Sequence, residues 1–283
     1  MSGAPTTIIS PEQLLRELDN PDWVIVDCRH DLADPEFGRA AYADGHLPGA
    51  RFVHLDEDLS GPKDGTNGRH PLPDVAALAQ RLGELGIDRT KQVIAYDDAG
   101  GMFAARLWWL LRWLGHERVA VLDGDLHAWR RHGGQLTRAP VVPSATRFEP
   151  VRQPIDAPLL DVLERYRDEH TLIVDARSPD RFRGENETID PVGGHIPGAI
   201  NRFFKDNLDA DGNFKPAAQL RREFTTLLDG VTPAQVIHQC GSGVTACHNL
   251  LAMEIAGLPG GRLYPGSWSE WCASDQRPVA TGP

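Results

Sequence analysis

The sequence predicts an α/β protein made of two similar units, each a mainly parallel sheet with helices on both faces. One basis is an internal repeat: VIVDCR and GHLPGA, beginning at Val24 and Gly45, return as LIVDAR and GHIPGA, beginning at Leu172 and Gly194. The other is the alternation, in each copy, of short apolar runs with amphipathic segments. Because 283 residues exceed one average domain, two hydrophobic cores are expected.

Local signals define the elements of each unit. Ser10, Pro11 and Gln13 match an N-cap, a first helical residue and a capping box, so a helix should run to about Leu18. The periodicity predicts helices over 74–85, 102–114, 216–228 and 244–256, and strands at WVIVD, VIAYD, VAVL, TLIVD, VIHQ and RLY. Such alternation is typical of a parallel sheet covered on both faces.

A proline-rich stretch separates the two copies. Residues 137–158 contain five prolines and no amphipathic period, as expected of a linker that crosses the surface. We therefore expect a first domain over residues 1–140, a linker over 141–155 and a second domain over 156–283.

Composition excludes several classes of function. The formal net charge of −11 argues against a surface that binds nucleic acid or anionic membrane. The N-terminus has no basic region, and no run of about 18 apolar residues occurs, so a cytoplasmic protein without membrane contact is expected. Four cysteines show neither the density of a disulfide scaffold nor the spacing of a zinc site, so no metal is expected.

One cysteine has the surroundings of a nucleophile. Cys240 follows the strand VIHQ and precedes Gly-Ser-Gly and a helix, and in open α/β sheets ligands bind beyond the carboxyl ends of strands. Unpaired amides and the positive end of a helix favour a thiolate over a thiol. The other three, Cys28, Cys247 and Cys272, are interpreted as buried small residues. Asp97 takes the place of Cys240 in the first copy, which is therefore expected to be non-catalytic.

The double unit, its VD-x-R and GH-x-PGA pairs and the loop CGSGVTA resemble the tandem rhodanese family of sulfurtransferases. The loop is similar to that of members that act on 3-mercaptopyruvate, and the resemblance covers nearly the whole chain. It implies two rhodanese-like domains and a sulfur atom carried as a persulfide on Cys240, with no cofactor. The implied partners are a small anionic sulfur donor and an acceptor, either cyanide or a thiol such as that of a thioredoxin-like protein.

The resemblance also places the substrate-binding residues. Arg181, in the run DARSPDRFRG, falls where the family has its substrate-binding arginine, and a guanidinium can hold a carboxylate with two hydrogen bonds. The loop that follows the cysteine would supply amides that stabilise charge on both sulfurs. The loop residues expected to bind substrate are Gly241, Gly243, Val244 and Thr245, the last of which could also cap or brace the loop.

A proton relay is implied for a 3-mercaptopyruvate donor. Ser242 occurs only in the copy with the cysteine, and in this group the loop serine acts with a histidine and an aspartate that by position resemble His70 and Asp56. Cys240, Ser242, His70 and Asp56 are therefore the candidate catalytic residues. His70 could instead be an exposed loop histidine and Asp56 a helix cap or a surface charge, with Asp58 as a rival.

Charged residues that recur in both copies are interpreted as structural. A residue present in the copy that lacks the cysteine has no reason to take part in the chemistry. These residues are Asp27, Arg29 and His46 in the first copy and Asp175, Arg177 and His195 in the second.

The choice of donor depends on two further observations. Relatives that use 3-mercaptopyruvate usually carry a second arginine before GHIPG, whereas residues 185–193 contain none, so either another cation replaces it or Arg181 and the loop amides suffice. Thiosulfate-type relatives carry bulky basic residues after the cysteine, whereas Gly241 and Ser242 should leave that space neutral and open. We therefore expect 3-mercaptopyruvate to be preferred, with thiosulfate as the alternative donor.

Two other classes of function fit the sequence poorly. A phosphatase on the same fold needs an arginine six positions after the cysteine to hold phosphate, and position 246 is Ala246. A non-catalytic binding module would lack the thiol.

Overall fold

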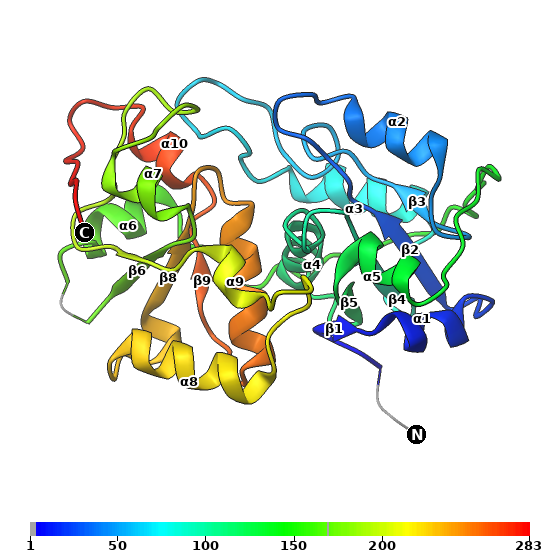
Figure 1. Ribbon diagram of the computed structural model, residues 1–283. Helices are drawn as coiled ribbons and strands as arrows, with labels where there is room; N and C mark the ends of the chain where they lie inside the picture. Colours follow the sequence, from blue (N-terminus) through cyan, green and yellow to red (C-terminus); the bar gives the residue numbers. More distant parts are fainter. Residues whose placement is uncertain (1–3, 169) are drawn as a thin grey trace. The chain divides into compact units, whose positions relative to one another are not determined.

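The computed structural model describes residues 4–168 and 170–283, which pack as two units (Figure 1). The first unit comprises residues up to Gly61, Leu72–Gln153 and Ala210–Phe214. The second comprises Pro62–Pro71, Pro154–Asp209 and Lys215–Pro283. Two short segments, Pro62–Pro71 and Ala210–Phe214, thus pack with the copy to which the repeat does not assign them.

The first unit is a parallel sheet with strand order β1-β5-β4-β2-β3. Its elements are β1 (Ile8–Ile9), α1 (Pro11–Glu17), β2 (Trp23–Asp27), α2 (Phe37–Asp44), β3 (Arg51–Phe52), α3 (Val75–Glu84), β4 (Gln92–Tyr96), α4 (Ala104–Trp113), β5 (Val119–Leu122) and α5 (Asp125–Arg131). Every residue of the central strand β4 is buried, so both faces of this sheet are covered. On one face Ile94 and Tyr96 pack with Leu14 of α1 and Trp129 of α5.

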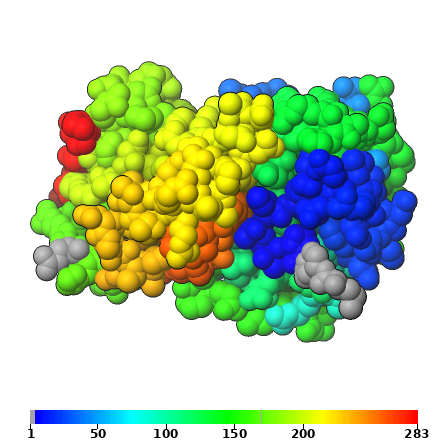
Figure 2. Space-filling model, turned by 60° about the horizontal axis from the view of Figure 1, so that its bottom comes forward, coloured from blue at the N-terminus to red at the C-terminus, as the bar shows by residue number. Residues whose placement is uncertain are grey.

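The second unit repeats this plan with strand order β7-β6-β8-β9, again all parallel. Its elements are α6 (Leu159–Arg165), β6 (Leu172–Asp175), α7 (Pro179–Arg183), β7 (Ile200–Asn201), the 3-10 helix η1 (Phe204–Asn207), α8 (Ala217–Leu228), the 3-10 helix η2 (Pro233–Gln235), β8 (Val236–Gln239), α9 (Thr245–Ile255), β9 (Arg262–Leu263) and α10 (Ser267–Trp271). One face of the sheet packs Ile173 and Ile237 against Trp268 and Trp271 of α10. Helix α8, gold in Figure 2, buries only its apolar stripe and lies at the surface of the unit.

The structure confirms the predicted α/β class and the helix signals. Ser10 accepts a hydrogen bond from the amide of Gln13 and Pro11 opens α1, as the capping box predicts. The predicted helix over 74–85 begins after Asp74, whose side chain accepts from two amides of the first turn. In the described part of the chain, no helix combines the length and apolar character needed to cross a bilayer.

The duplicated charged residues tie loops together in both units. Arg29 donates to Asp27 and to the carbonyl of Gly45, and Arg177 donates to Asp175 and to the carbonyl of Gly194. Asp27 and Asp175 are fully buried, so each carboxylate needs this partner. The geometry agrees with the structural role that duplication predicts for these residues.

Candidate active site

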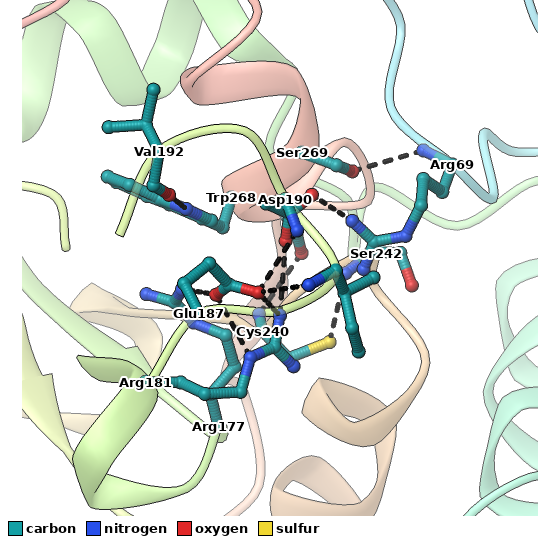
Figure 3. Close-up of polar contacts among 12 residues, drawn as sticks. Arg69, Arg177, Arg181, Glu187, Asp190, Val192, Cys240, Ser242, Trp268 and Ser269 are labelled. Carbon is teal, nitrogen blue, oxygen red and sulfur yellow. Dashed lines mark hydrogen bonds and ion pairs between the residues drawn. The ribbon is translucent and has the colours of Figure 1, made fainter. Parts of the chain in front are cut away.

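Cys240 lies where β8 ends and a short loop leads into α9 (Figure 3). Its Sγ accepts hydrogen bonds from the backbone N–H of Gly243 at 3.1 Å and of Ser242 at 3.5 Å. The side chain is 2% exposed, so the sulfur faces protein dipoles more than water. Two amides aimed at one sulfur stabilise negative charge on it, as a backbone nest does for other anions.

The start of α10 fixes the backbone of this loop. The N–H of Cys240 donates to Ser267 Oγ at 3.1 Å, and the N–H of Trp268 donates back to the carbonyl of Cys240 at 2.9 Å. Gly243 has φ +77°, and a Cβ there would lie 2.4 Å from the carbonyl oxygen of Pro265. Glycine is therefore required at 243 both for its conformation and for the close approach of the two backbones.

Ser242 contacts both the sulfur of Cys240 and a histidine. Its N–H points at Cys240, and its Oγ lies 2.7 Å from Nδ1 of His70. Both side chains are buried, at 5% and 4% exposure, so His70 is not the exposed loop histidine that the sequence left open. The structure therefore brings together three of the four candidate catalytic residues, and the tautomer of His70 decides which of the two atoms donates.

Asp56 belongs to the other unit, where it lies beside His30 with 3.8 Å between its Oδ2 and Nε2 of the histidine. Its part in a relay therefore stays a prediction. The rival Asp58 is engaged in its own unit, since it accepts from Arg81 at 2.8 Å and from the amide of His54 at 2.8 Å. These contacts give Asp58 a structural role.

Arg181, on α7, is held by two acidic side chains. Its Nε and Nη2 each donate to Glu187 at 2.9 Å, and Nη2 also donates to Asp190 at 3.1 Å (Figure 3). Burial works against the charge of Glu187, but the hydrogen bond from Arg181 and two backbone amides hold the pKa of Glu187 below its ordinary value. Burial raises the pKa of Asp190, against the lowering effect of the nearby Arg69 and Arg181.

Arg69 is a site residue that the sequence interpretation missed. It forms an ion pair with Asp190, and its Nη2 lies 2.8 Å from the position that a Cβ on Gly241 would take. Both terminal nitrogens of Arg181 lie within 3.7 Å of the same position. The expectation of an open space after Cys240 is therefore wrong, because two guanidinium groups border Gly241, although the carboxylates of Glu187 and Asp190 offset their charge.

The rest of the loop starts the following helix. Val244 is the N-cap of α9 without a side-chain cap bond, and Thr245 is the first helical residue, so Thr245 does not cap the helix. The roles of Gly241, Val244 and Thr245 toward a substrate stay predictions.

The other cysteines are buried, as expected. Burial and the nearby Asp27 raise the pKa of Cys28 well above its usual range, and burial raises the pKa of Cys272 to about 11. Cys247 donates from its Sγ to the carbonyl of Gly243 at 3.3 Å. Thiolate formation at Cys28 or Cys272 is thus disfavoured near neutral pH.

Comparison with known proteins agrees with this geometry. The family model for the rhodanese-like domain matches the chain twice, at residues 10–132 and 159–274. A protein of Pseudomonas aeruginosa named probable 3-mercaptopyruvate sulfurtransferase is 48% identical over 280 residues, covering 97% of this chain and 98% of that protein. Thiosulfate sulfurtransferase of Bos taurus is 35% identical over 244 residues, covering 82% of this chain and 79% of that protein.

Solved structures show the same relationship. The structure of 3-mercaptopyruvate sulfurtransferase from Leishmania major matches with a TM-score of 0.85 at 28% identity, covering 97% of this chain and 76% of that one. Three observations lead to one assignment. The same domain family matches twice, relatives share nearly the full length of the chain, and the cysteine loop follows the expected strand. The chain is a member of the rhodanese family, with two rhodanese-like domains in tandem.

Proposed function

We propose that this chain is a sulfurtransferase that moves a sulfur atom from 3-mercaptopyruvate, through a persulfide on Cys240, to a thiol or cyanide acceptor. One observation carries the proposal: Ser242 places its N–H on the Cys240 sulfur and its hydroxyl 2.7 Å from His70. A nucleophile stabilised as an anion and a group able to move a proton are thereby joined in one loop.

In the first half-reaction the Cys240 thiolate attacks the sulfur of the donor. A sulfur–sulfur bond forms, the donor's carbon–sulfur bond breaks, and its electron pair leaves with the carbon as the enolate of pyruvate. The enolate takes up a proton and becomes pyruvate. The N–H groups of Ser242 and Gly243 stabilise the charge on sulfur as the bonds change.

The proton for the enolate would come through Ser242. His70 would then restore the serine proton, because the two side chains are in hydrogen-bond contact and shielded from water. The place of Asp56 as a third member of the relay rests on the sequence alone.

In the second half-reaction a nucleophilic acceptor attacks the outer sulfur of the persulfide. The sulfur–sulfur bond breaks, its electrons return to Cys240, and the product is thiocyanate from cyanide or a new persulfide from a thiol. The two half-reactions balance without a cofactor. A small thiol and a thioredoxin-like protein are both suitable acceptors by their chemistry.

Thiosulfate is the second candidate donor, because the named relatives include both donor classes. A dianion would profit from the two guanidiniums beside Gly241. The buried carboxylates Glu187 and Asp190 offset that positive charge, which favours the monoanionic keto acid.

The test is to load the protein with 3-mercaptopyruvate in the absence of acceptor and measure the mass of each cysteine-containing peptide. We expect one added sulfur atom, about 32 mass units, on Cys240, since the amides of Ser242 and Gly243 are aimed at this sulfur and the Ser242–His70 pair lies beside it. Cys240→Ser should abolish loading and turnover, whereas Cys247→Ser should retain both. Loading of another cysteine, or turnover by Cys240→Ser, would contradict the proposal.

A further inference from the structure

We propose that Asp190 sets which donor charge the site accepts, so that a donor with one negative charge is favoured over a donor with two. The inference deepens the proposed function and rests on it, since 3-mercaptopyruvate carries one carboxylate whereas thiosulfate is a dianion. Asp190 lies in the loop 185–193, which carries acidic residues and no arginine. Its effect passes through the two guanidiniums that border Gly241.

Asp190 bridges these two guanidiniums. Its Oδ1 pairs with Nη1 of Arg69, and its Oδ2 accepts from Nη2 of Arg181 at 3.1 Å (Figure 3). Nη2 of each arginine lies within 3.6 Å of the position that a Cβ on Gly241 would take, and Gly241 directly follows Cys240. The carboxylate is therefore one guanidinium away from the space beside the nucleophile.

The charges of this group cancel. Arg69 and Arg181 contribute two positive charges, and Asp190 and Glu187 contribute two negative ones. A site without net charge attracts a dianion little more than a monoanion, yet a dianion loses the hydration of two charges when it binds. The balance therefore favours the monoanion, and loss of one acid would leave a net positive charge that favours the dianion.

Of the two acids, Glu187 also shapes the loop. It accepts from Nη1 of Arg177 at 3.4 Å and from the amides of Ile189 and Asp190 at 2.9 and 3.0 Å. These bonds form the turn that carries Asp190. The side chain of Asp190 contacts instead the two arginines of the site. A substitution at Asp190 therefore changes the charge of the site and leaves the bonds that shape the loop.

Burial makes the charge of Asp190 effective. Its side chain is 3% exposed, whereas those of Arg69 and Arg181 are 28% and 18% exposed. Water therefore screens this carboxylate less than it screens a surface charge. Pro191 follows it in the chain, and its own N–H is bonded to Glu187, so its backbone is restrained from both sides.

The experiment compares Asp190→Asn with wild type, first in kcat/KM for 3-mercaptopyruvate and for thiosulfate with cyanide as acceptor. At about 6 Å and an effective dielectric constant of about 40, one carboxylate weakens the binding of each negative charge about tenfold. Its neutralisation should therefore lower the KM for thiosulfate and raise the ratio of kcat/KM for thiosulfate to that for 3-mercaptopyruvate about tenfold. Damage to the loop would not produce a gain with thiosulfate.

A second measurement needs no turnover. Sulfate, a dianion, and pyruvate, a monoanion, are each tested for the concentration that protects Cys240 from iodoacetamide. In wild type, pyruvate should protect at the lower concentration. In Asp190→Asn, the protecting concentration of sulfate should fall about tenfold relative to that of pyruvate.

Two control variants separate the charge of Asp190 from its shape and from the charge of the surface. Glu185→Gln removes one acid from the same loop, but this side chain is 58% exposed and pairs with Arg183, so the variant should match wild type in both measurements. Asp190→Glu keeps the charge and should keep the wild-type preference. If Asp190→Asn does not fold, Asp190→Ser, which also removes the charge, replaces it.

The outcomes distinguish this inference from the proposed function. A change below about threefold in both ratios, or an equal change in Glu185→Gln or Asp190→Glu, would overturn the role of Asp190, while transfer from 3-mercaptopyruvate by wild type would still uphold the function. If wild type transfers no sulfur from 3-mercaptopyruvate but protection by sulfate responds to Asp190→Asn as expected, the charge selection stands and the proposed function fails.

Discussion

Replacing Ser242 by alanine tests how the site moves protons. The substitution removes an Oγ that lies 2.7 Å from Nδ1 of His70. It leaves the N–H that points at Cys240, because that group belongs to the backbone. The variant therefore separates the proposed relay from the stabilisation of the sulfur anion.

The expected effect depends on the donor. Positioned acid–base groups contribute about 10²- to 10⁴-fold, or about 2.7 to 5.5 kcal/mol of activation free energy. We expect kcat/KM for 3-mercaptopyruvate to fall at least about 100-fold, because its enolate must be protonated. Thiosulfate releases sulfite, a stable anion that needs no proton, so its kcat/KM should change by less than about fivefold.

The assay follows pyruvate release with 3-mercaptopyruvate and thiocyanate formation with thiosulfate, at one cyanide concentration. Ser274→Ala is the matched control, since its hydroxyl lies in the same unit and accepts from the nearby amide of Gln276 at 3.3 Å. His70→Asn should reproduce the loss, and the double variant should be no worse than either single one, because both residues serve one step.

Two results would refute this reasoning. A loss below about tenfold with 3-mercaptopyruvate would mean that Ser242 does not carry a catalytic proton. Equal losses with both donors would mean that the hydroxyl supports the loop instead, and the contact with His70 would then be structural.

Two further predictions concern the scaffold. Gly243→Ala should lower kcat/KM at least about tenfold and reduce the free energy of unfolding, because the new Cβ would lie 2.4 Å from the carbonyl oxygen of Pro265. The control Gly230→Ala has φ +90° and open space around the new Cβ, so it should show only the cost of the backbone conformation. Steady-state kinetics and denaturant unfolding of the two variants measure these effects. Burial lowers the pKa of His238 to about 3 from 6.5, so as pH falls below 6.5 the unfolded state binds a proton that the native state does not. The unfolding free energy of wild type should therefore lose about 1.6 kcal/mol relative to His238→Leu between pH 6.5 and 5, and equal losses in the two proteins would contradict the prediction.

Much of the fold was predictable because its signals are local. The capping box at Ser10 and the N-cap at Asp74 involve residues two or three positions apart, and the buried strands are continuous apolar runs. The position of Cys240 at the end of a strand could be predicted for the same reason, since a strand, a glycine loop and a helix follow each other directly there.

Arg69 and its acidic partners could not be predicted in this way. The hydrogen bond from the N–H of Arg69 to Ser269 Oγ joins residues 200 positions apart, and Pro62–Pro71 packs with a unit that is distant from it in the sequence. Its sequence, rich in glycine and proline, has no period from which a docking surface could be inferred. The one available signal was the absence of arginine from 185–193, which indicated that a cation was missing but not where it would come from.

The first unit shows what the loop does without its cysteine. The Asp97 carboxylate accepts four backbone N–H groups, from Ala99 and Gly101 on one oxygen and from Phe103 and Ala104 on the other. Burial raises the pKa of Asp97 to about 6, although these four hydrogen bonds act to lower it. In this unit the hydrogen bonds of the loop amides are thus taken up by the side chain of Asp97.

The supporting backbone contact is the same in both units. The N–H of Leu126 donates to the carbonyl of Asp97 at 3.0 Å, as the N–H of Trp268 does to the carbonyl of Cys240 at 2.9 Å. A strand, a loop and a helix therefore form a cluster of inward-facing amides whichever residue stands at its centre. With a carboxylate there, the amides are occupied by a side chain of the protein itself. With a thiol there, the proposed mechanism has the same amides stabilise a charge that forms and disappears during sulfur transfer, so the two units would differ in this side chain and not in architecture.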